Sequence, residues 1–156
     1  MEITGIRYVR CKGTLDYDGP LGEERLVQPV DIYPEFRAMQ ASWPVRKGER
    51  PPYPLEQRFL LIDTDADISG IWAPISDGEA YIIEHSLKSI LLGEDPRATE
   101  RIWDKMYRAS IHGRKGETMM AISAVDLALW DIKGKRLGVP AYELLGGPIR
   151  ERIRCY

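Results

Sequence analysis

Cysteine and histidine are scarce in this chain, whose 156 residues contain two of each. The two cysteines, Cys11 and Cys155, lie almost a chain length apart, and neither belongs to a C-x-x-C motif or has a histidine close by in the sequence. This spacing gives no disulfide framework and none of the usual zinc patterns. We expect both cysteines to be reduced structural thiols, with a bridge between them left open as the alternative.

An excess of charge and long apolar runs are also missing. The 22 basic and 24 acidic side chains nearly cancel, which leaves no positive surface of the kind that binds a nucleic acid or an anionic membrane. No stretch approaches the roughly 20 consecutive apolar residues that span a bilayer, and the opening Met-Glu-Ile-Thr does not resemble a secretory signal. We expect a cytoplasmic protein with no nucleic acid and no membrane partner. Its 44% of hydrophobic residues are enough for a folded core.

Short apolar runs predict a small antiparallel sheet. Residues 3–10 alternate loosely between apolar and polar side chains, which is typical of a strand. Residues 58–63 and 68–73 are two further apolar runs, and the polar residues 64–67 between them predict a hairpin. The expected fold class is therefore α+β, with a three-stranded antiparallel sheet followed by helices.

A long segment, residues 14–57, separates the first strand from the hairpin and contains seven of the eleven prolines. Proline removes backbone donors and disfavours helix, so little regular structure is expected there. A structureless excursion of this length inside a domain is typical of a lid or binding loop, and a mobile surface loop is the alternative. The sequence alone leaves both open.

A period near 3.6 after the hairpin predicts three helices. Ser76 and Glu79 match a capping box at the start of the first helix, which should run to about Gly93. Asp95 followed by Pro96 predicts the start of the second. The third, residues 117–137, has apolar residues along one face and ends at Gly138 and Pro140. A short helical turn at residues 141–145 and Gly146-Gly147-Pro148 then lead into residues 149–156, which we expect to begin another strand.

The third helix contains two aspartates that could be mistaken for a catalytic pair. Asp126 and Asp131 are five residues apart and therefore point about 140° away from each other on a helix. Lys135 follows Asp131 by one turn and should form an ion pair with it. Gly134 in the same helix indicates close packing of another backbone.

The remaining candidates are basic side chains. In the long segment, Arg25, Arg46 and Arg50 are suited to binding a carboxylate through two parallel hydrogen bonds, although solvated surface arginine is the ordinary alternative. A weaker set, His112, Arg114 and Lys115, lies in a glycine-bounded loop that could meet an anion or simply connect two helices. The sequence shows no nucleophile with a base, no metal-ligand cluster and no nucleotide-binding motif, so we expect no catalytic residue and no metal site in this chain.

The run AISAVDLALWDIKGKRLGVPAYELLGG, residues 121–147, closely resembles the segment that ends the N-terminal capping domain in the mandelate racemase and muconate lactonizing enzyme branch of the enolase superfamily. The order of elements agrees with that domain. Three stretches resemble, more narrowly, L-rhamnonate dehydratase and related sugar-acid dehydratases: VQPVDIYPEF (27–36), IEHSL (83–87) and GRKG (113–116).

The resemblance implies a two-domain enzyme in which residues 1–147 cap the mouth of a (β/α)8-type barrel. Residues 148–156 would be the start of that barrel, which is missing after its first strand. In the superfamily, acidic residues at the barrel strand ends bind Mg²⁺, and a base removes the proton α to a carboxylate. The expected parent is therefore a Mg²⁺-dependent lyase of an aldonic acid and a homo-oligomer. This chain alone should be inactive, and the long segment should cover the substrate.

Two other interpretations stay open. A racemase or cycloisomerase of the same branch would share the capping domain. A protein of another class, a free-standing α+β module that binds an anion or a protein, would use the arginine-bearing segment directly. Its tail would then pack against its own sheet.

Overall fold

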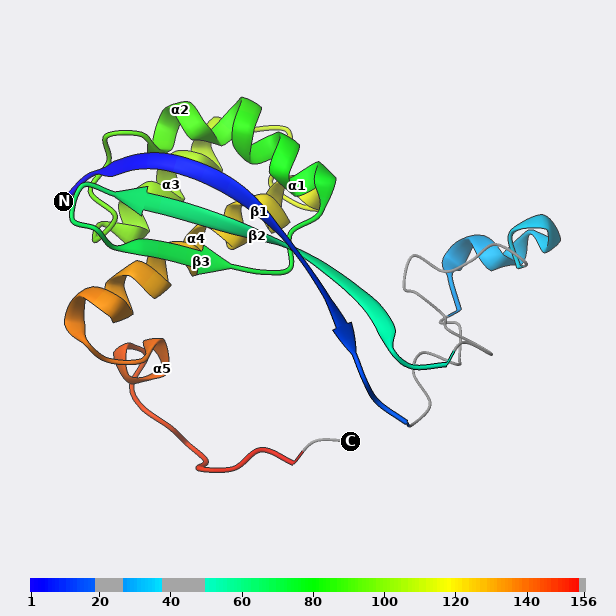
Figure 1. The fold of residues 1–156 in the computed structure, drawn as a ribbon. Helices are drawn as coiled ribbons and strands as arrows, with labels where there is room; N and C mark the ends of the chain where they lie inside the picture. The colour runs from blue at the N-terminus through cyan, green and yellow to red at the C-terminus, as the bar shows by residue number, and fades with distance from the viewer. Residues whose placement is uncertain (19–26, 38–49, 155–156) are drawn as a thin grey trace. The chain divides into compact units, whose positions relative to one another are not determined.

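A computed structural model describes residues 1–18, 27–37 and 50–154 (Figure 1). The chain divides into two compact units. The larger consists of Met1–Cys11 and Gln57–Tyr156, and the smaller is Lys12–Glu56. The larger unit holds the predicted sheet and helices, and the smaller holds most of the proline-rich segment.

Three strands, β1 (Ile3–Leu15), β2 (Tyr53–Thr64) and β3 (Ser69–Trp72), form one antiparallel sheet in the order β1-β2-β3. The predicted hairpin is confirmed, with Leu60 opposite Trp72 and Asp63 opposite Ser69. Both long strands extend further than predicted, so the ends of the expected loop over residues 14–57 are strand. Pro54 is tolerated in β2 because β3 pairs only with residues 60–63, which leaves this end of β2 one neighbour.

The smaller unit contains two short 3₁₀ helices, η1 (Pro29–Ile32) and η2 (Pro34–Phe36). Each begins with a proline, whose fixed φ suits the first helical position. In η1 the backbone N–H of Gln28 donates to the carboxylate of Asp31 at 2.7 Å. The prolines therefore start single helical turns in this segment rather than excluding them.

The first predicted helix is confirmed but interrupted. It consists of α1 (Asp77–Ile82), a π-helical turn η3 (Ile83–Leu87) and α2 (Lys88–Leu91). The capping box is present, since the Ser76 hydroxyl accepts from the Glu79 N–H at 3.1 Å and the Glu79 carboxylate accepts from the Ser76 N–H at 2.6 Å. These two bonds fix the point at which the chain leaves the sheet for the helical layer.

The second helix, α3 (Thr99–Ala109), starts about one turn later than predicted. Asp95 does not cap it. Its carboxylate instead accepts from the Arg97 N–H at 3.0 Å and binds the Arg97 guanidinium at 2.7 Å, which holds residues 95–98 in a separate turn. The local pair competes with the helix for the aspartate, so the cap prediction was wrong.

The third helix, α4 (Glu117–Leu137), has the predicted bounds, and α5 (Ala141–Leu144) follows it. Gly138 ends α4 in the left-handed conformation with φ 70°. Gly134 allows the close approach that was predicted, because a Cβ there would lie 2.8 Å from the Val139 carbonyl oxygen. The strand predicted from residue 149 onward does not form over the described residues 149–154, because no neighbouring strand is available there for pairing.

The helices cover one face of the sheet, and the core lies between them (Figure 1). The fully buried large side chains come from β1, β2, η3, α2, α3 and α4: Ile3, Leu60, Ile62, Ile83, Leu87, Leu91, Ile102, Met106, Ile122, Val125, Leu129 and Ile132. Among the residues that the structure describes, no helix has the length and apolar character needed to cross a membrane.

The predicted Asp131–Lys135 ion pair is confirmed, and both side chains also bind backbone groups of β3. Its two charged groups lie 2.6 Å apart. The Asp131 carboxylate also accepts from the Ile71 N–H at 2.8 Å, and the Lys135 ammonium donates to the Ser69 carbonyl at 2.8 Å. Because β3 is an edge strand, these bonds occupy backbone groups that could otherwise pair with another chain.

Candidate functional site

Of the three arginines proposed to bind substrate, the structure places one. Arg50 is exposed and precedes β2 in the chain. Arg25 and Arg46 lie outside the described residues. Their role in substrate binding therefore stays a prediction.

The connection from β3 to α1, residues 73–76, lies beside β2 in the larger unit. The strand continues into residues 73–76, where the Ile75 N–H donates to the Arg58 carbonyl at 3.3 Å. Arg58, which is 18% exposed, forms an ion pair with Asp77 at the first turn of α1. This pair connects β2 to the start of the helical layer, and no local sequence pattern predicts it.

The start of α4 lies beside the start of α1. A Cβ at Gly78 would lie 3.3 Å from a carboxylate oxygen of Glu117. The loop of residues 112–116 leads directly into Glu117, so it belongs to the same end of the unit as the Arg58–Asp77 pair. The loop with His112, Arg114 and Lys115 is thus at the same end of the unit as residues 73–76, which connect the sheet to α1.

Within that loop, Arg114 is held against α3. Its guanidinium carbon lies 4.6 Å above the ring of Tyr107, and its Nε donates to the Tyr107 carbonyl at 3.2 Å. Tyr107 in turn stacks on Trp103 with ring centroids 4.8 Å apart. An arginine that binds a carbonyl in the last turn of a helix stabilises the helix end.

The other two members of the weaker set face solvent. His112 and Lys115 are exposed, and no hydrogen bond or ion pair joins either to another of the described residues. They remain the groups of this loop that are available to an anion. Whether they bind one is not tested by the geometry, so this role also stays a prediction.

The shifted pKa values belong to structural contacts. Burial, followed by the nearby Glu84 carboxylate, raises the pKa of Tyr8 to about 12, and its hydroxyl donates to the Ala80 carbonyl at 3.2 Å. The hydrogen-bonded Arg7 guanidinium lowers the pKa of Asp63. Burial raises the pKa of Asp126. Asp63 also accepts a hydrogen bond from the Ser69 hydroxyl at 2.6 Å, so its carboxylate joins side chains of β1 and β3.

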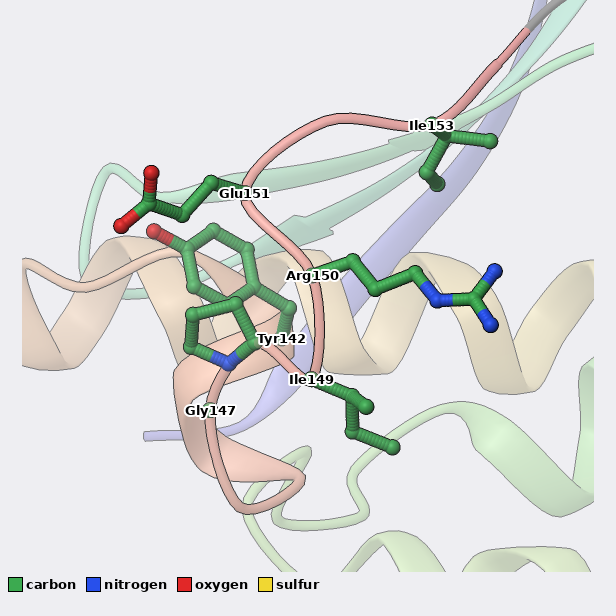
Figure 2. A pocket seen from close by; sticks show the side chains of 7 residues that line it. Tyr142, Gly147, Ile149, Arg150, Glu151 and Ile153 are labelled. Carbon is green, nitrogen blue, oxygen red and sulfur yellow. The ribbon is translucent and has the colours of Figure 1, made fainter.

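A hollow of about 940 Å³ lies at the tail, where it is lined by α5 and the residues that follow it (Figure 2). Tyr142, Ile149 and Ile153 contribute apolar surface, and they are 52%, 99% and 82% exposed. Such open apolar walls fit contact with a protein surface better than enclosure of a polar sugar acid.

Metal ligands are not clustered in the described residues. No group of three His, Cys, Asp or Glu side chains lies close enough together there to hold a metal ion. Cys11 is an exposed free thiol, and Cys155 lies outside the described residues.

A small antiparallel sheet covered on one face by three helices is the architecture of an N-terminal capping domain. The family described as "Mandelate racemase / muconate lactonizing enzyme, N-terminal domain" matches residues 55–146, more than half of the chain. The chain therefore belongs to this family of the enolase superfamily, as its N-terminal capping domain.

The chain is similar to sugar-acid dehydratases. A protein of Caldivirga maquilingensis with the provisional name L-rhamnonate dehydratase is 37% identical over 96% of this chain and 37% of its own length. A D-galactonate dehydratase of Variovorax paradoxus is 46% identical over 63% of this chain and 26% of its own length. The solved L-rhamnonate dehydratase of Gibberella zeae superposes with a TM-score of 0.71 and 26% identity, over 96% of this chain and 36% of that one. The chain thus spans between about a quarter and two fifths of these relatives.

Proposed function

We propose that this chain is the capping domain of a Mg²⁺-dependent sugar-acid dehydratase, and that it supplies substrate recognition while the catalytic groups lie in the rest of the protein. The observation that carries the proposal is the 37% identity to a dehydratase relative over 96% of the chain. The matched length is that of a capping domain alone. We therefore propose that residues 1–147 are the cap and that the chain by itself does not turn over substrate.

The reaction is removal of the proton α to the carboxylate of an aldonic acid, followed by loss of the β-hydroxyl as water. The enol that results gives an α-keto acid. Magnesium, when bound, supplies positive charge that stabilises the negative charge formed on the carboxylate. Because the described residues hold no cluster that fits a metal ion, no step is assigned to them, and we propose that the ion is bound outside this domain.

Recognition is assigned to the long segment. A guanidinium group binds a carboxylate through two parallel hydrogen bonds, so Arg25, Arg46 and Arg50 are our candidates for the acid group of the substrate. His112 and Lys115 form a second, weaker set. The relatives act, by name, on two different sugar acids, L-rhamnonate and D-galactonate, so the proposal extends to the class of aldonic acids and to no single member.

The exposed tail favours a capping domain over a free-standing module. A self-contained module would pack residues 149–154 against its own sheet, whereas Ile149 and Ile153 are 99% and 82% exposed. A racemase or cycloisomerase of the same family remains the alternative reaction, and homo-oligomerisation remains a prediction from the family.

The test joins this chain to the C-terminal remainder of the Caldivirga maquilingensis relative, in place of the matching segment of that protein. Each of Arg25, Arg46 and Arg50 is replaced by alanine, and kcat/KM is measured for a panel of aldonic acids. Loss of one charged hydrogen-bonding contact is worth about 1.5–3 kcal/mol, or about 10- to 100-fold. Arg108→Ala is the matched control, because Arg108 is an exposed arginine paired with Asp104 on α3. Unchanged kcat/KM for all three variants on every acid would rule the recognition role out.

A further inference from the structure

The loop between α3 and α4, residues 110–116, is held at three points although most of its side chains are exposed. Its first part is a turn closed by the Gly113 N–H, which donates to the Ser110 carbonyl at 3.0 Å. Gly113 also packs closely on the first turn of α4, because a Cβ there would lie 2.6 Å from the Thr118 hydroxyl oxygen. The last residue, Gly116, is the N-cap of α4. The backbone of this exposed loop is therefore bound at both ends.

The side chain of Arg114 adds a fourth attachment. Its guanidinium carbon lies 4.6 Å from the centre of the Tyr107 ring, and its Nε donates to the Tyr107 carbonyl at 3.2 Å. The ring itself is supported, because it stacks on Trp103 with centroids 4.8 Å and planes 12° apart. A guanidinium binds a carboxylate best through two parallel N–H groups, and the edge that includes Nε is already used here. Arg114 is thus suited to holding the loop rather than to binding an anion.

Two side chains with donor groups lie between these attachments. His112 is inside the closed turn, and Lys115 lies between Arg114 and the N-cap of α4. Both are exposed, and neither is paired with another of the residues that the structure describes. An anion that meets both pays less in lost freedom when the backbone that presents them is already ordered.

This loop belongs to the end of the larger unit at which the long segment is attached. The chain leaves that unit after Cys11 and re-enters it at Gln57. Because the sheet is antiparallel, both points lie at the end where β3 finishes and the connection to α1 begins. The starts of α1 and α4 lie side by side there, since a Cβ at Gly78 would be 3.3 Å from the Glu117 carboxylate. The segment proposed to cover the substrate is therefore attached at the end that also holds this loop.

We propose that Arg114 is a positioning residue for substrate recognition, which does not touch the aldonic acid but holds the loop so that His112 and Lys115 meet the carboxylate of that acid. The proposal rests on the proposed function for the identity of the substrate class. It reassigns Arg114, which the sequence groups with the two anion-binding candidates, because the guanidinium face and the Nε are both occupied by Tyr107.

The test uses the joined protein with the Caldivirga maquilingensis remainder and measures kcat and KM for a panel of aldonic acids. Arg114→Ala releases the loop and leaves His112 and Lys115 in place. We expect KM to rise about 3- to 10-fold with kcat unchanged, because ordering two side chains on a mobile loop weakens binding of substrate and transition state alike. Arg108→Ala is the matched control, an exposed arginine of α3 paired with Asp104, and it should leave KM unchanged.

Tyr107→Leu separates positioning from direct binding. This variant removes the ring beneath Arg114 and keeps the guanidinium in the chain, with folding verified by circular dichroism. A positioning residue loses its effect together with the ring, so we expect KM to rise as it does in Arg114→Ala. A guanidinium that binds the acid itself would be released by the change, so an unchanged KM in Tyr107→Leu would overturn the proposal.

A thermodynamic cycle separates positioning from a general effect on stability. Arg114→Ala is added to the double variant His112→Ala, Lys115→Ala. If Arg114 acts through these two side chains, the added substitution raises KM no further. A further rise equal to that of Arg114→Ala alone would show an independent effect and would overturn the proposal.

Amide hydrogen exchange of the isolated chain measures the hold on the loop without any reaction. Arg114→Ala should speed exchange of the Gly113 amide several-fold, and Arg108→Ala should not; equal exchange in the two variants would contradict the proposal. The two levels fail separately. Absence of turnover in the unsubstituted joined protein would contradict the proposed function, whereas an active joined protein whose KM is unchanged in Arg114→Ala would contradict the positioning role.

Discussion

Replacing Gly70 with alanine should destabilise the domain strongly, because β3 and α4 touch backbone to backbone at this residue. A Cβ there would lie 2.1 Å from the Ala128 carbonyl oxygen and 2.7 Å from the Ile132 Cγ1. Ordinary contacts of carbon are about 3.5–4 Å. The first clash is with helix backbone, so a side-chain rotation cannot relieve it, and α4 would have to move away from the sheet together with its Asp131 bond to β3.

The cost of overfilling a packed core is about 1–3 kcal/mol, and a backbone clash belongs at the upper end, so we expect about 3 kcal/mol. For a chain of this size that loss lowers the Tm by about 6–12 °C. The assay is thermal unfolding followed by circular dichroism. Gly13→Ala is the control, since a Cβ at Gly13 meets no atom within 4 Å and should change stability by less than about 0.5 kcal/mol. Equal Tm values for the two variants would refute the backbone contact.

Two further predictions concern charged contacts of the sheet. Asp131→Ala removes the acceptor of the Ile71 N–H at 2.8 Å and should lower the free energy of unfolding in urea by about 1–3 kcal/mol. Asp131→Asn should lower it by less, because the amide keeps an oxygen acceptor. An unchanged midpoint of unfolding for the alanine variant would show that the edge bond is not needed. Asp63 has a lowered pKa because of its pair with Arg7, so its stabilising contribution is present above its ordinary pKa and disappears as the pH falls through the lower folded value. Asp63→Asn should therefore reduce the loss of Tm in acid, and an identical acid profile for the variant would contradict the pairing.

The features that could be predicted from the sequence are those set by local chemistry. The Ser76–Glu79 capping box involves residues three positions apart, and it forms as expected. The bounds of α4 follow from its apolar period and from Gly138, and the Asp131–Lys135 pair follows from one helical turn. The specific match to a known capping domain came from residues 121–147, which form the most regular part of the chain.

The features that were missed depend on competition or on distant contacts. Asp95 looked like a helix cap, but Arg97 binds its carboxylate and the helix starts later. The role of Asp131 at the β3 edge depends on a bond across 60 positions.

The substrate-binding role of the candidate residues stays a prediction. The sequence pointed to basic residues, and the structure places Arg50, His112 and Lys115 in exposed positions while Arg114 is held on Tyr107. No local pattern could show the Arg58–Asp77 pair, because it forms between a strand and a helix that only the fold brings together.

The most direct test of the central claim compares the isolated chain with the joined protein in one assay. Both are incubated with a panel of aldonic acids and Mg²⁺, and the formation of α-keto acid is followed, with folding of each protein verified by circular dichroism. The account predicts Mg²⁺-dependent product from the folded joined protein and none from the isolated chain. Turnover by the isolated chain, or a folded joined protein that forms no α-keto acid from any aldonic acid, would contradict it.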